Sequence, residues 1–395
     1  MISLSSARRF LARILIILVA CIRKTLPRFK GPSPQQVLVV HRLLLGDLVM
    51  TGYLLKRISI LYPSAERFIF CKADQSALFQ CHPYGFKPLI YDPHSLRALF
   101  KMMAQTRVRA RHSIAYVLGD NRYAWIARCL GASKIYGFSG GRKVHGWMLD
   151  EEVEVPIAAK SLPEVFAALS GGSSVTPFEA KDWPLPAATR DDIRLSQLLS
   201  RINSREYTGT LFFHTGASNV VKTWLPANWS KLTRHFTNWG YFVILSCGRG
   251  EAYTLPSHAD LDVDRTEIIE GQLSLEGVSK LMRLSRLVIS PDTGVSHLAR
   301  ISQVPSVTLF GPGNPRLCAD SGGYWDAARH KYLFIEDMHC RDQNSLFKRN
   351  ISWVRKCNRD HNTCVGDRAC MKRISVEAVI SEAKDLLDRY GHADH

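Results

Sequence analysis

The sequence lacks both a hydrophobic run long enough to cross a membrane and a cleavage site for secretion. The apolar run near its start, residues 14–22, has nine residues, whereas a membrane-spanning helix needs about 20. Arg23 and Lys24 follow that run directly, in the place where a signal peptide carries small residues. We therefore expect a cytoplasmic protein that neither spans a membrane nor is secreted.

Acidic residues are scarce relative to basic ones. The 395 residues include 52 Lys and Arg but only 35 Asp and Glu, which gives a formal net charge of +17. Such an excess predicts an anionic partner. The sequence has no zinc-finger spacing and no RNA-recognition aromatic motif, so an acidic membrane surface or a phosphorylated substrate is favoured over nucleic acid.

Closely paired cysteines are also missing. None of the ten cysteines forms a CxxC pair, and the four nearest the C-terminus are separated by 16, 6 and 5 residues. These four are Cys340, Cys357, Cys364 and Cys370. Their spacing favours unpaired, reduced thiols. A structural metal bound by the four thiols is the less favoured alternative.

Residues 1–30 contain seven Arg and Lys residues and no acidic residue, and these cations flank the apolar run. This pattern favours an interfacial anchor on an anionic leaflet. The alternative is a helix packed against the body of the protein. Because the Gly31-Pro32-Ser33-Pro34 linker ends the segment before the first strand, we expect the segment to be separable from the fold.

Short apolar runs alternate with segments of helical periodicity along the rest of the chain. Runs such as 37–40 and 68–71 predict buried strands of a first domain, and runs such as 210–213 and 287–289 predict those of a second. Strands that alternate with helices predict parallel, doubly wound sheets. A proline-containing stretch near residues 184–190 predicts the boundary between the domains.

One stretch has the composition of a ligand-binding turn. Asp292-Thr293-Gly294 follows the apolar run at 287–289, and residues 296–299 resume at helical spacing. A polar turn between the end of a strand and the start of a helix presents unpaired N–H groups to an anion. Open α/β sheets hold phosphorylated ligands at such turns. The alternative is an ordinary βαβ unit with a capped helix.

The strings D-T-G-V-S-H-L-A at 292–299 and F-G-P-G-N-P at 310–315 resemble the nucleotide-sugar signature of glycosyltransferase family 9, the ADP-heptose:lipopolysaccharide heptosyltransferases. Gly46-Asp47 and K-T-W-L-P at 222–226 match further elements of that family in the same order. The resemblance covers about residues 37–385. It implies the GT-B architecture, an α/β fold in which two Rossmann-like doubly wound domains face a central cleft.

The expected organisation has four parts. They are a basic and apolar N-terminal segment with its linker at 1–34, an acceptor domain at 35–186, a nucleotide-sugar-binding domain at 187–374, and a C-terminal helix at 375–395 that crosses back to the first domain.

The resemblance also implies roles for individual residues. Asp47 matches the proposed general base of the family, and Arg42 and Arg122 are candidates for acceptor binding. The candidates for nucleotide-sugar binding are Gly46, Thr215, Gly216, Ser218, Lys222, Glu251, Asp292, Thr293, Gly294 and His297. From the residues alone, Asp47 has the position of a helix N-cap, Lys222 that of a solvated lysine, and His297 that of a packed or capping residue.

Two further features of the sequence are the absence of a metal-binding element and the presence of a basic run. No paired D-x-D element stands in a phosphate-facing turn, and the family needs no metal ion, so we expect no metal and no cofactor besides the ADP-sugar donor. The basic run is explained equally well by solvent-exposed side chains on one face of the protein and by a binding surface for an anionic acceptor. It consists of Lys101, Arg107, Arg109, Arg111, Arg122 and Arg128.

The implied function is the inverting transfer of a heptose from ADP-heptose to the lipopolysaccharide inner core, either Kdo-lipid A or a heptosylated core. The implied partners are the nucleotide-sugar donor, an anionic glycolipid acceptor and the cytoplasmic face of the inner membrane of a Gram-negative cell, to which the protein would bind peripherally. No nucleic acid is expected. The alternatives are a transferase of the same fold that modifies a protein or another glycan, and a non-catalytic nucleotide-binding module.

Overall fold

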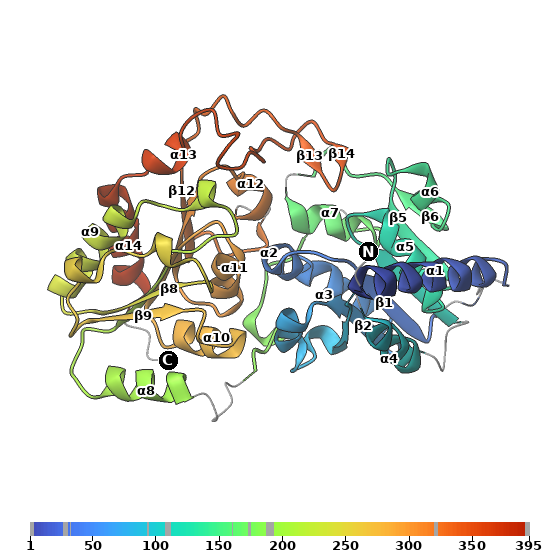
Figure 1. The fold of residues 1–395 in the computed structure, drawn as a ribbon, viewed down its shortest axis with the longest axis horizontal. Helices are drawn as coiled ribbons and strands as arrows, with labels where there is room; N and C mark the ends of the chain where they lie inside the picture. The colour runs from blue at the N-terminus through green and yellow to red at the C-terminus, as the bar shows by residue number, and fades with distance from the viewer. Residues whose placement is uncertain are drawn as a thin grey trace.

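Two parallel six-stranded sheets lie side by side in the computed structural model, each covered by helices (Figure 1). The structure describes residues 4–26, 31, 33–92, 95–106, 112–159, 161–172, 175–186, 193–319 and 323–391. The predicted α/β class, with two doubly wound sheets, is confirmed.

The first sheet consists of strands whose central members are buried on both faces. All five residues of the Q-V-L-V-V strand are buried, as is typical of a parallel strand covered by helices on each side. The strands are β1 (Gln36–Val40), β2 (Glu66–Cys71), β3 (Phe86–Ile90), β4 (Ser113–Val117), β5 (Lys134–Phe138) and β6 (Glu151–Val153). Their order is β3-β2-β1-β4-β5-β6, and every neighbouring pair is parallel.

The second sheet repeats this order. Its strands are β7 (Thr210–His214), β8 (Phe242–Cys247), β9 (Thr266–Glu270), β10 (Leu287–Pro291), β11 (Ser306–Phe310) and β12 (His330–Phe334). They run β9-β8-β7-β10-β11-β12, all parallel. In both sheets the direction of winding reverses at one point, between β1 and β4 and between β7 and β10. Ligands of open α/β sheets bind beyond the carboxyl ends of the strands at such points.

Helices connect the strands and cover the sheets. Those of the first half are α2 (Leu45–Val49), α3 (Gly52–Leu61), α4 (Leu96–Thr106), α5 (Ala124–Cys129), α6 (Lys143–Gly146) and α7 (Leu162–Ala168). Those of the second are α8 (Ile193–Asn203), α9 (Pro226–Asn238), α10 (Leu275–Arg283), α11 (Gly294–Ile301), α12 (Pro315–Cys318), α13 (Ala369–Lys372) and α14 (Val376–Tyr390). Local sequence sets several starts: Pro226 begins α9, and the Ser274 and Ser375 hydroxyls cap α10 and α14.

The predicted crossing of the last helix back to the first domain is wrong. Helix α14 packs against β10, β11, β12 and α9 of the second sheet. Its apolar side chains Val379 and Leu386 join the core that also contains Trp229, because the cap at Ser375 starts the helix directly after α13, over this sheet. The boundary predicted between residues 186 and 187 adjoins residues 187–192, which lie outside the described residues.

A different segment crosses between the domains. Residues 335–372, here called the strap, leave β12, reach the first domain and return to α13 (Figure 1). At the crossing the short pair β13 (Ser345–Leu346) and β14 (Arg349–Asn350) docks on loops of the first sheet. The buried Arg349 guanidinium donates to the carbonyls of Gly119 and Phe138, each at 2.7 Å, and Lys348 pairs with Asp120 at 2.7 Å.

The N-terminal segment forms helix α1 (Leu4–Lys24), which packs chiefly on α5 and also touches α4. Ala12 and Ala20 are buried at this contact, and the Lys24 ammonium lies 3.2 Å from the Asp150 carboxylate. One face of residues 14–22 packs on the body of the protein, as the second alternative predicted, while the other face is exposed. The interfacial anchor stays a prediction. Of the helices in the described ranges, none combines the length and hydrophobicity needed to cross a membrane.

Arg128 does not belong to a basic surface. It is buried, donates to the Ala132 carbonyl at 2.7 Å and pairs with Asp150, so neither predicted explanation fits this residue. Its charge is satisfied inside the protein by a carboxylate and carbonyls. Three other members of the basic run, at positions 107, 109 and 111, lie outside the described residues.

Candidate functional site

Asp47 follows β1 at the reversal point of the first sheet. The N-cap of α2 is Leu44, and no side chain caps this helix, so the interpretation of Asp47 as a cap is wrong. The helix begins at Leu45, earlier than the sequence suggests, which places Asp47 inside its first turn. In the described part of the chain the Asp47 carboxylate accepts no hydrogen bond. It is therefore free to receive a proton from a substrate.

The protonation of Asp47 is shifted by its surroundings. Burial raises the pKa of its carboxyl to about 6, while the charges of Lys222 and Lys356 oppose the rise and that of Asp292 adds to it. A carboxylate with a pKa near 6 is a stronger base than a solvated one, yet it is still ionised at neutral pH. These properties suit a general base.

The turn at 292–294 follows β10 at the reversal point of the second sheet. Thr293 is the N-cap of α11, with extended backbone and no capping bond from its side chain. Among the described residues its Oγ1 atom is buried without a hydrogen-bond partner. The first turn of α11 also leaves backbone N–H groups unpaired. An unpaired hydroxyl beside a helix N-terminus is suited to bind a phosphate oxygen.

Lys222 and Asp292 are brought together although they are far apart in sequence. The Lys222 ammonium donates to the carbonyl oxygen of Asp292 at 3.1 Å and to its carboxylate at 3.2 Å. The charge of Asp292 raises the pKa of Lys222. Burial raises the pKa of Asp292, but Lys222, His297 and Arg300 outweigh that effect, so its net shift is downward. Lys222 is therefore a fixed cation at the turn rather than a freely solvated lysine.

The two domains meet at the starts of α2 and α11, which pack against each other. The His297 ring lies over Gly46 so closely that a Cβ atom there would come within 2.6 Å of the ring, so only glycine fits. Arg300 donates to His297 Nδ1 at 3.3 Å. Burial, followed by the charge of Arg300, lowers the pKa of His297 to about 3. His297 is thus a neutral residue packed at the domain junction.

Lys356 was missed by the sequence analysis. It lies on the strap, and the next residue, Cys357, donates its backbone N–H to the carbonyl of Pro312 at 2.9 Å. Burial lowers the pKa of Lys356, and the charge of Asp47 opposes this. The positive charges of Lys222 and Lys356 therefore both act on Asp47. No local pattern links Lys356 to Asp47, because Lys356 lies 309 residues after Asp47 in the sequence.

The predicted nucleotide-sugar residues near β7 and β8 fall into two groups. The Glu251 carboxylate accepts from the Gly248 N–H at 2.9 Å and lies against Gly216, where a Cβ atom would approach it within 2.0 Å. Ser218 is exposed in the same loop. Thr215, in contrast, is fully buried, and its hydroxyl lies 2.7 Å from that of Thr254. Its side chain therefore connects the loop after β7 to the loop after β8.

The two candidate acceptor residues lie beyond the carboxyl ends of the first sheet. Arg42 is exposed in the loop after β1. Arg122 pairs with Asp120 at 2.8 Å and lies over the Tyr123 ring, 5.4 Å from its centre. Both arginines are exposed in segments that follow strands of the first sheet.

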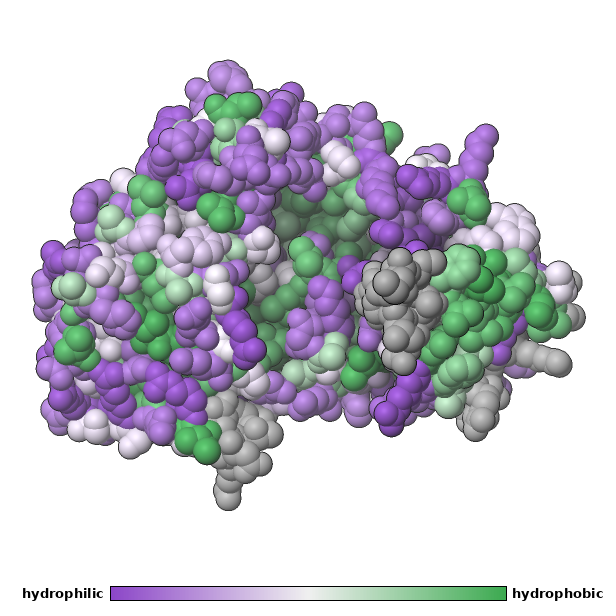
Figure 2. Space-filling view, in the orientation of Figure 1, coloured by the Kyte–Doolittle hydropathy of each residue, from purple (hydrophilic) through white to green (hydrophobic). Residues whose placement is uncertain are grey.

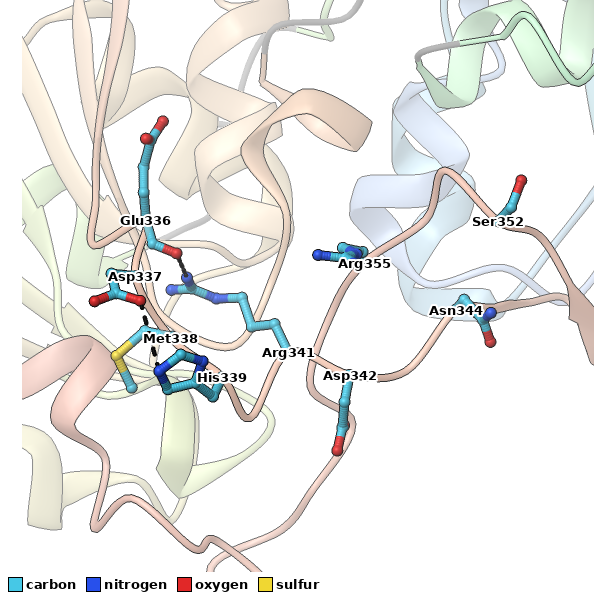
Figure 3. A pocket seen from close by; sticks show the side chains of 9 residues that line it. All are labelled: Glu336, Asp337, Met338, His339, Arg341, Asp342, Asn344, Ser352 and Arg355. Atoms are coloured by element: carbon cyan, nitrogen blue, oxygen red, sulfur yellow. Dashed lines mark hydrogen bonds and ion pairs between the residues drawn. The ribbon is translucent and has the colours of Figure 1, made fainter.

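A separate cavity of about 470 Å³ lies along the strap (Figure 3). Several of its side chains interact within the cavity: Arg341 donates to the Glu336 carbonyl at 3.3 Å, and His339 lies 3.9 Å from Asp337. It contains neither Asp47 nor Lys222. We therefore place the candidate reaction site in the hollow between the two halves of the molecule (Figure 2) and not in this cavity.

All ten cysteines lie in the described part of the chain, and none of them forms a disulfide. Within the residues that the structure describes, no group of three His, Cys, Asp or Glu side chains has an arrangement that holds a metal ion. Cys340, Cys357 and Cys364 are partly buried and Cys370 is buried, all on or at the end of the strap.

The site combines a free carboxylate with fixed positive charge. Asp47 lies on the first domain, and Lys222 and the α11 N-terminus lie on the second, with Lys356 reaching both from the strap. Such a site can accept a proton from a hydroxyl on one side and stabilise a departing phosphate on the other.

Comparisons with known proteins agree with this arrangement. A model of glycosyltransferase family 9 (heptosyltransferase) matches residues 107–350, more than half of the chain. Lipopolysaccharide heptosyltransferase 1 of Pseudomonas aeruginosa is 26% identical over 198 residues, 49% of this chain and 52% of that protein. The chain thus spans about half the length of this curated relative.

Solved structures extend the likeness to the whole fold. The glycosyl transferase family 9 from Veillonella parvula has a TM-score of 0.72 at 16% identity and covers 92% of this chain and 100% of its own. The E. coli ADP-heptose lps heptosyltransferase II has a TM-score of 0.63 at 17% identity and covers 90% and 99%. At these identities the likeness concerns the fold alone, and the expected GT-B architecture is confirmed.

Proposed function

Since the chain belongs to glycosyltransferase family 9, we propose that it transfers a heptose from ADP-heptose to the lipopolysaccharide inner core, with inversion at the anomeric carbon. One observation carries the proposal. Asp47 at the start of α2 and the turn at 292–294 at the start of α11 meet at the domain junction, with Lys222 and Lys356 acting on Asp47.

In this mechanism Asp47 is the general base. The acceptor hydroxyl attacks the anomeric carbon on the face opposite the diphosphate, and the Asp47 carboxylate takes the hydroxyl proton. The new bond joins the acceptor oxygen to the anomeric carbon. A pKa of about 6 supports this role, because the carboxyl is ionised at neutral pH and is basic enough to assist.

The bond from the anomeric carbon to the diphosphate breaks in the same step, and its electron pair leaves with ADP. The positive charge of Lys222 and the amides at the start of α11 would stabilise this leaving group, and Thr293 would donate its otherwise unpaired hydroxyl. We propose that no metal ion is required, since these groups can supply the stabilisation. Glu251 and Gly216 would bind the nucleotide, and no cofactor besides the donor is needed.

The proposed acceptor is an anionic glycolipid at the cytoplasmic face of the inner membrane. The net charge of +17 and the exposed Arg42 and Arg122 on the first domain support an acidic acceptor. The protein would then be bound peripherally to that membrane.

The proposal is tested with purified protein, ADP-heptose and two acceptors, Kdo-lipid A and a heptosylated core, in the presence of EDTA. We expect ADP release and a heptose mass increment on one acceptor, with an anomeric configuration opposite to that of the donor. Asp47→Asn is the control and should form product at least about 100-fold more slowly. Transfer to neither acceptor but to a protein or another glycan offered in parallel would show that the chain is a transferase of the same fold with a different acceptor. ADP binding without any transfer would refute the enzymatic proposal.

A further inference from the structure

Helix α1 exposes a continuous apolar face. On a helical projection with 3.6 residues per turn, six exposed side chains fall on one arc opposite the buried Ala12 and Ala20. These six residues, here called the docking face, are Phe10, Leu11, Ile14, Ile17, Leu18 and Ile22. Figure 2 shows the hydrophobic area that they form over α1.

The docking face has no partner in the described part of the chain. Helix α1 cannot rotate to bury this face, because its other side is already packed. The opposite side of α1 already packs on α5, and Lys24 is tied to Asp150. Phe10 and Ile22 are each 65% exposed. A contiguous apolar surface of this kind on a protein marks an interaction site.

The charges around the docking face indicate which partner covers it. Arg13 is exposed on α1 next to the apolar arc. Helix α4, which contacts α1, adds exposed Arg97, Phe100 and Lys101. Arg23 and Phe100 line a shallow groove between these helices. Residues 1–30 contain no acidic residue. An apolar helix face bordered by cations matches the surface of an anionic bilayer.

The docking face is also linked to the acceptor side of the cleft. Burial raises the pKa of Tyr91, and the charges of Arg42 and Arg13 oppose that rise, so both arginines lie near this phenol. The Tyr91 ring in turn contacts Tyr123, 6.4 Å between centres, and Arg122 lies over Tyr123. A row of cations and aromatic rings therefore runs from α1 to both candidate acceptor residues.

We propose that the docking face, together with Arg13, Arg97 and Lys101, binds an anionic lipid bilayer and holds the acceptor side of the cleft at its surface. This inference rests on the proposed function for its purpose, since it names the surface through which a lipid-linked acceptor reaches Arg42 and Arg122. Its geometry does not depend on the sugar that is transferred.

The test measures flotation of the full chain with vesicles of phosphatidylglycerol and phosphatidylethanolamine, and with vesicles of phosphatidylcholine alone. The docking variant carries Phe10→Gln, Leu18→Gln and Ile22→Gln. The matched control carries Ile60→Gln, Ile157→Gln and Ile193→Gln, which replace apolar residues elsewhere that are even more exposed (70%, 86% and 74%). No donor or acceptor is present, so failure of this inference is distinct from failure of the proposed function.

We expect the wild type to bind the anionic vesicles and to release at high salt. The docking variant should bind at least about tenfold more weakly, while the control variant binds as the wild type does. Arg97→Gln and Lys101→Gln should each weaken binding about fivefold, which provides a test that leaves the apolar face intact.

Three outcomes would overturn the inference. One is a wild type that does not float with anionic vesicles at low salt. Another is a docking variant that binds as tightly as the control. The third is a wild-type dimer, measured by light scattering without lipid, that the docking variant dissociates while neither binds vesicles, since the face would then pair with a second copy of the chain.

Discussion

Replacing Lys356 by Met should move the acidic limb of the activity profile to higher pH. The charge of Lys356 lowers the pKa of the Asp47 carboxyl, which burial raises to about 6. Methionine keeps most of the volume of the side chain and removes the charge. Since an adjacent cation typically lowers a carboxyl pKa by about 1–3 units, its loss should raise the pKa of Asp47 to roughly 7.

The direction of this shift in the activity profile follows from the proposed role of Asp47 as a general base. Asp47 accepts a proton only when ionised, so activity rises with pH through its pKa. With a pKa of about 6 roughly half of the enzyme is active at pH 6, and with a pKa of about 7 only about a tenth is. Activity at pH 6 should therefore fall about fivefold, relative to the activity at pH 8, where both proteins are mostly ionised.

The assay is kcat/KM for ADP release between pH 5 and 9, which reports the pKa values of the free enzyme. Lys372→Met is the matched control, because Lys372 follows at the end of the strap, exposed and paired with Asp367. Its acidic limb should stay near pH 6. If the acidic limb of the Lys356→Met profile stayed at the pH of the wild type, the coupling of Lys356 to Asp47 would be refuted, whatever the maximum value of kcat/KM.

Three further changes test other parts of the structure. Asp47→Asn should lower turnover about 10²–10⁴-fold with ADP affinity unchanged by calorimetry, and near-native turnover would exclude a base at this position. Lys222→Ala should weaken ADP binding about 10–100-fold, the value of a charge-assisted hydrogen bond, while Lys222→Arg retains most of it; equal affinities in calorimetry would exclude a contact with the diphosphate. Deleting residues 1–26 should destabilise the fold by on the order of 3 kcal/mol, because the side of α1 that carries Ala20 and Lys24 is buried on α5. The loss should lower Tm by roughly 6–12 °C. An unchanged Tm would show that α1 adds nothing to the fold and that the segment is separable, as the linker at 31–34 suggested.

The periodicity of the sequence was sufficient to predict the two parallel sheets and the position of the turn at 292–294. Apolar runs bounded by polar turns identify buried strands without long-range information, and parallel doubly wound sheets bring the turns after β1, β7 and β10 to known edges. The roles predicted for Asp47, Gly216 and Asp292 came from the family resemblance, and the positions of these turns at the sheet edges are consistent with it. The pairing of Lys222 with Asp292 was not predicted as such, because it depends on the detailed path of the loop before α9.

Other features depend on contacts that leave no local signal. Arg128 looks like any surface arginine in sequence, and only its pairing with Asp150 explains its burial. The amphipathic character of α14 was visible, but not which sheet it covers, since either sheet offers an apolar face. For α1, the apolar run showed that the segment buries hydrophobic surface, but the division between a packed face and an exposed face depends on α5.

The strap connects these observations to function. It is held to the first domain by the buried Arg349 and to the second by Arg341, which donates to the Gly311 carbonyl at 2.7 Å. Lys356 follows both attachments in the sequence, directly before the bond from the Cys357 N–H to the Pro312 carbonyl, and its charge acts on Asp47. Asp47 and the two cations that act on it thus come from three separate segments, which meet only when the domains and the strap are assembled. The pKa of Asp47 is consequently a property of the domain arrangement, and a substitution that displaces the strap should alter this pKa even when no residue of the first domain is replaced.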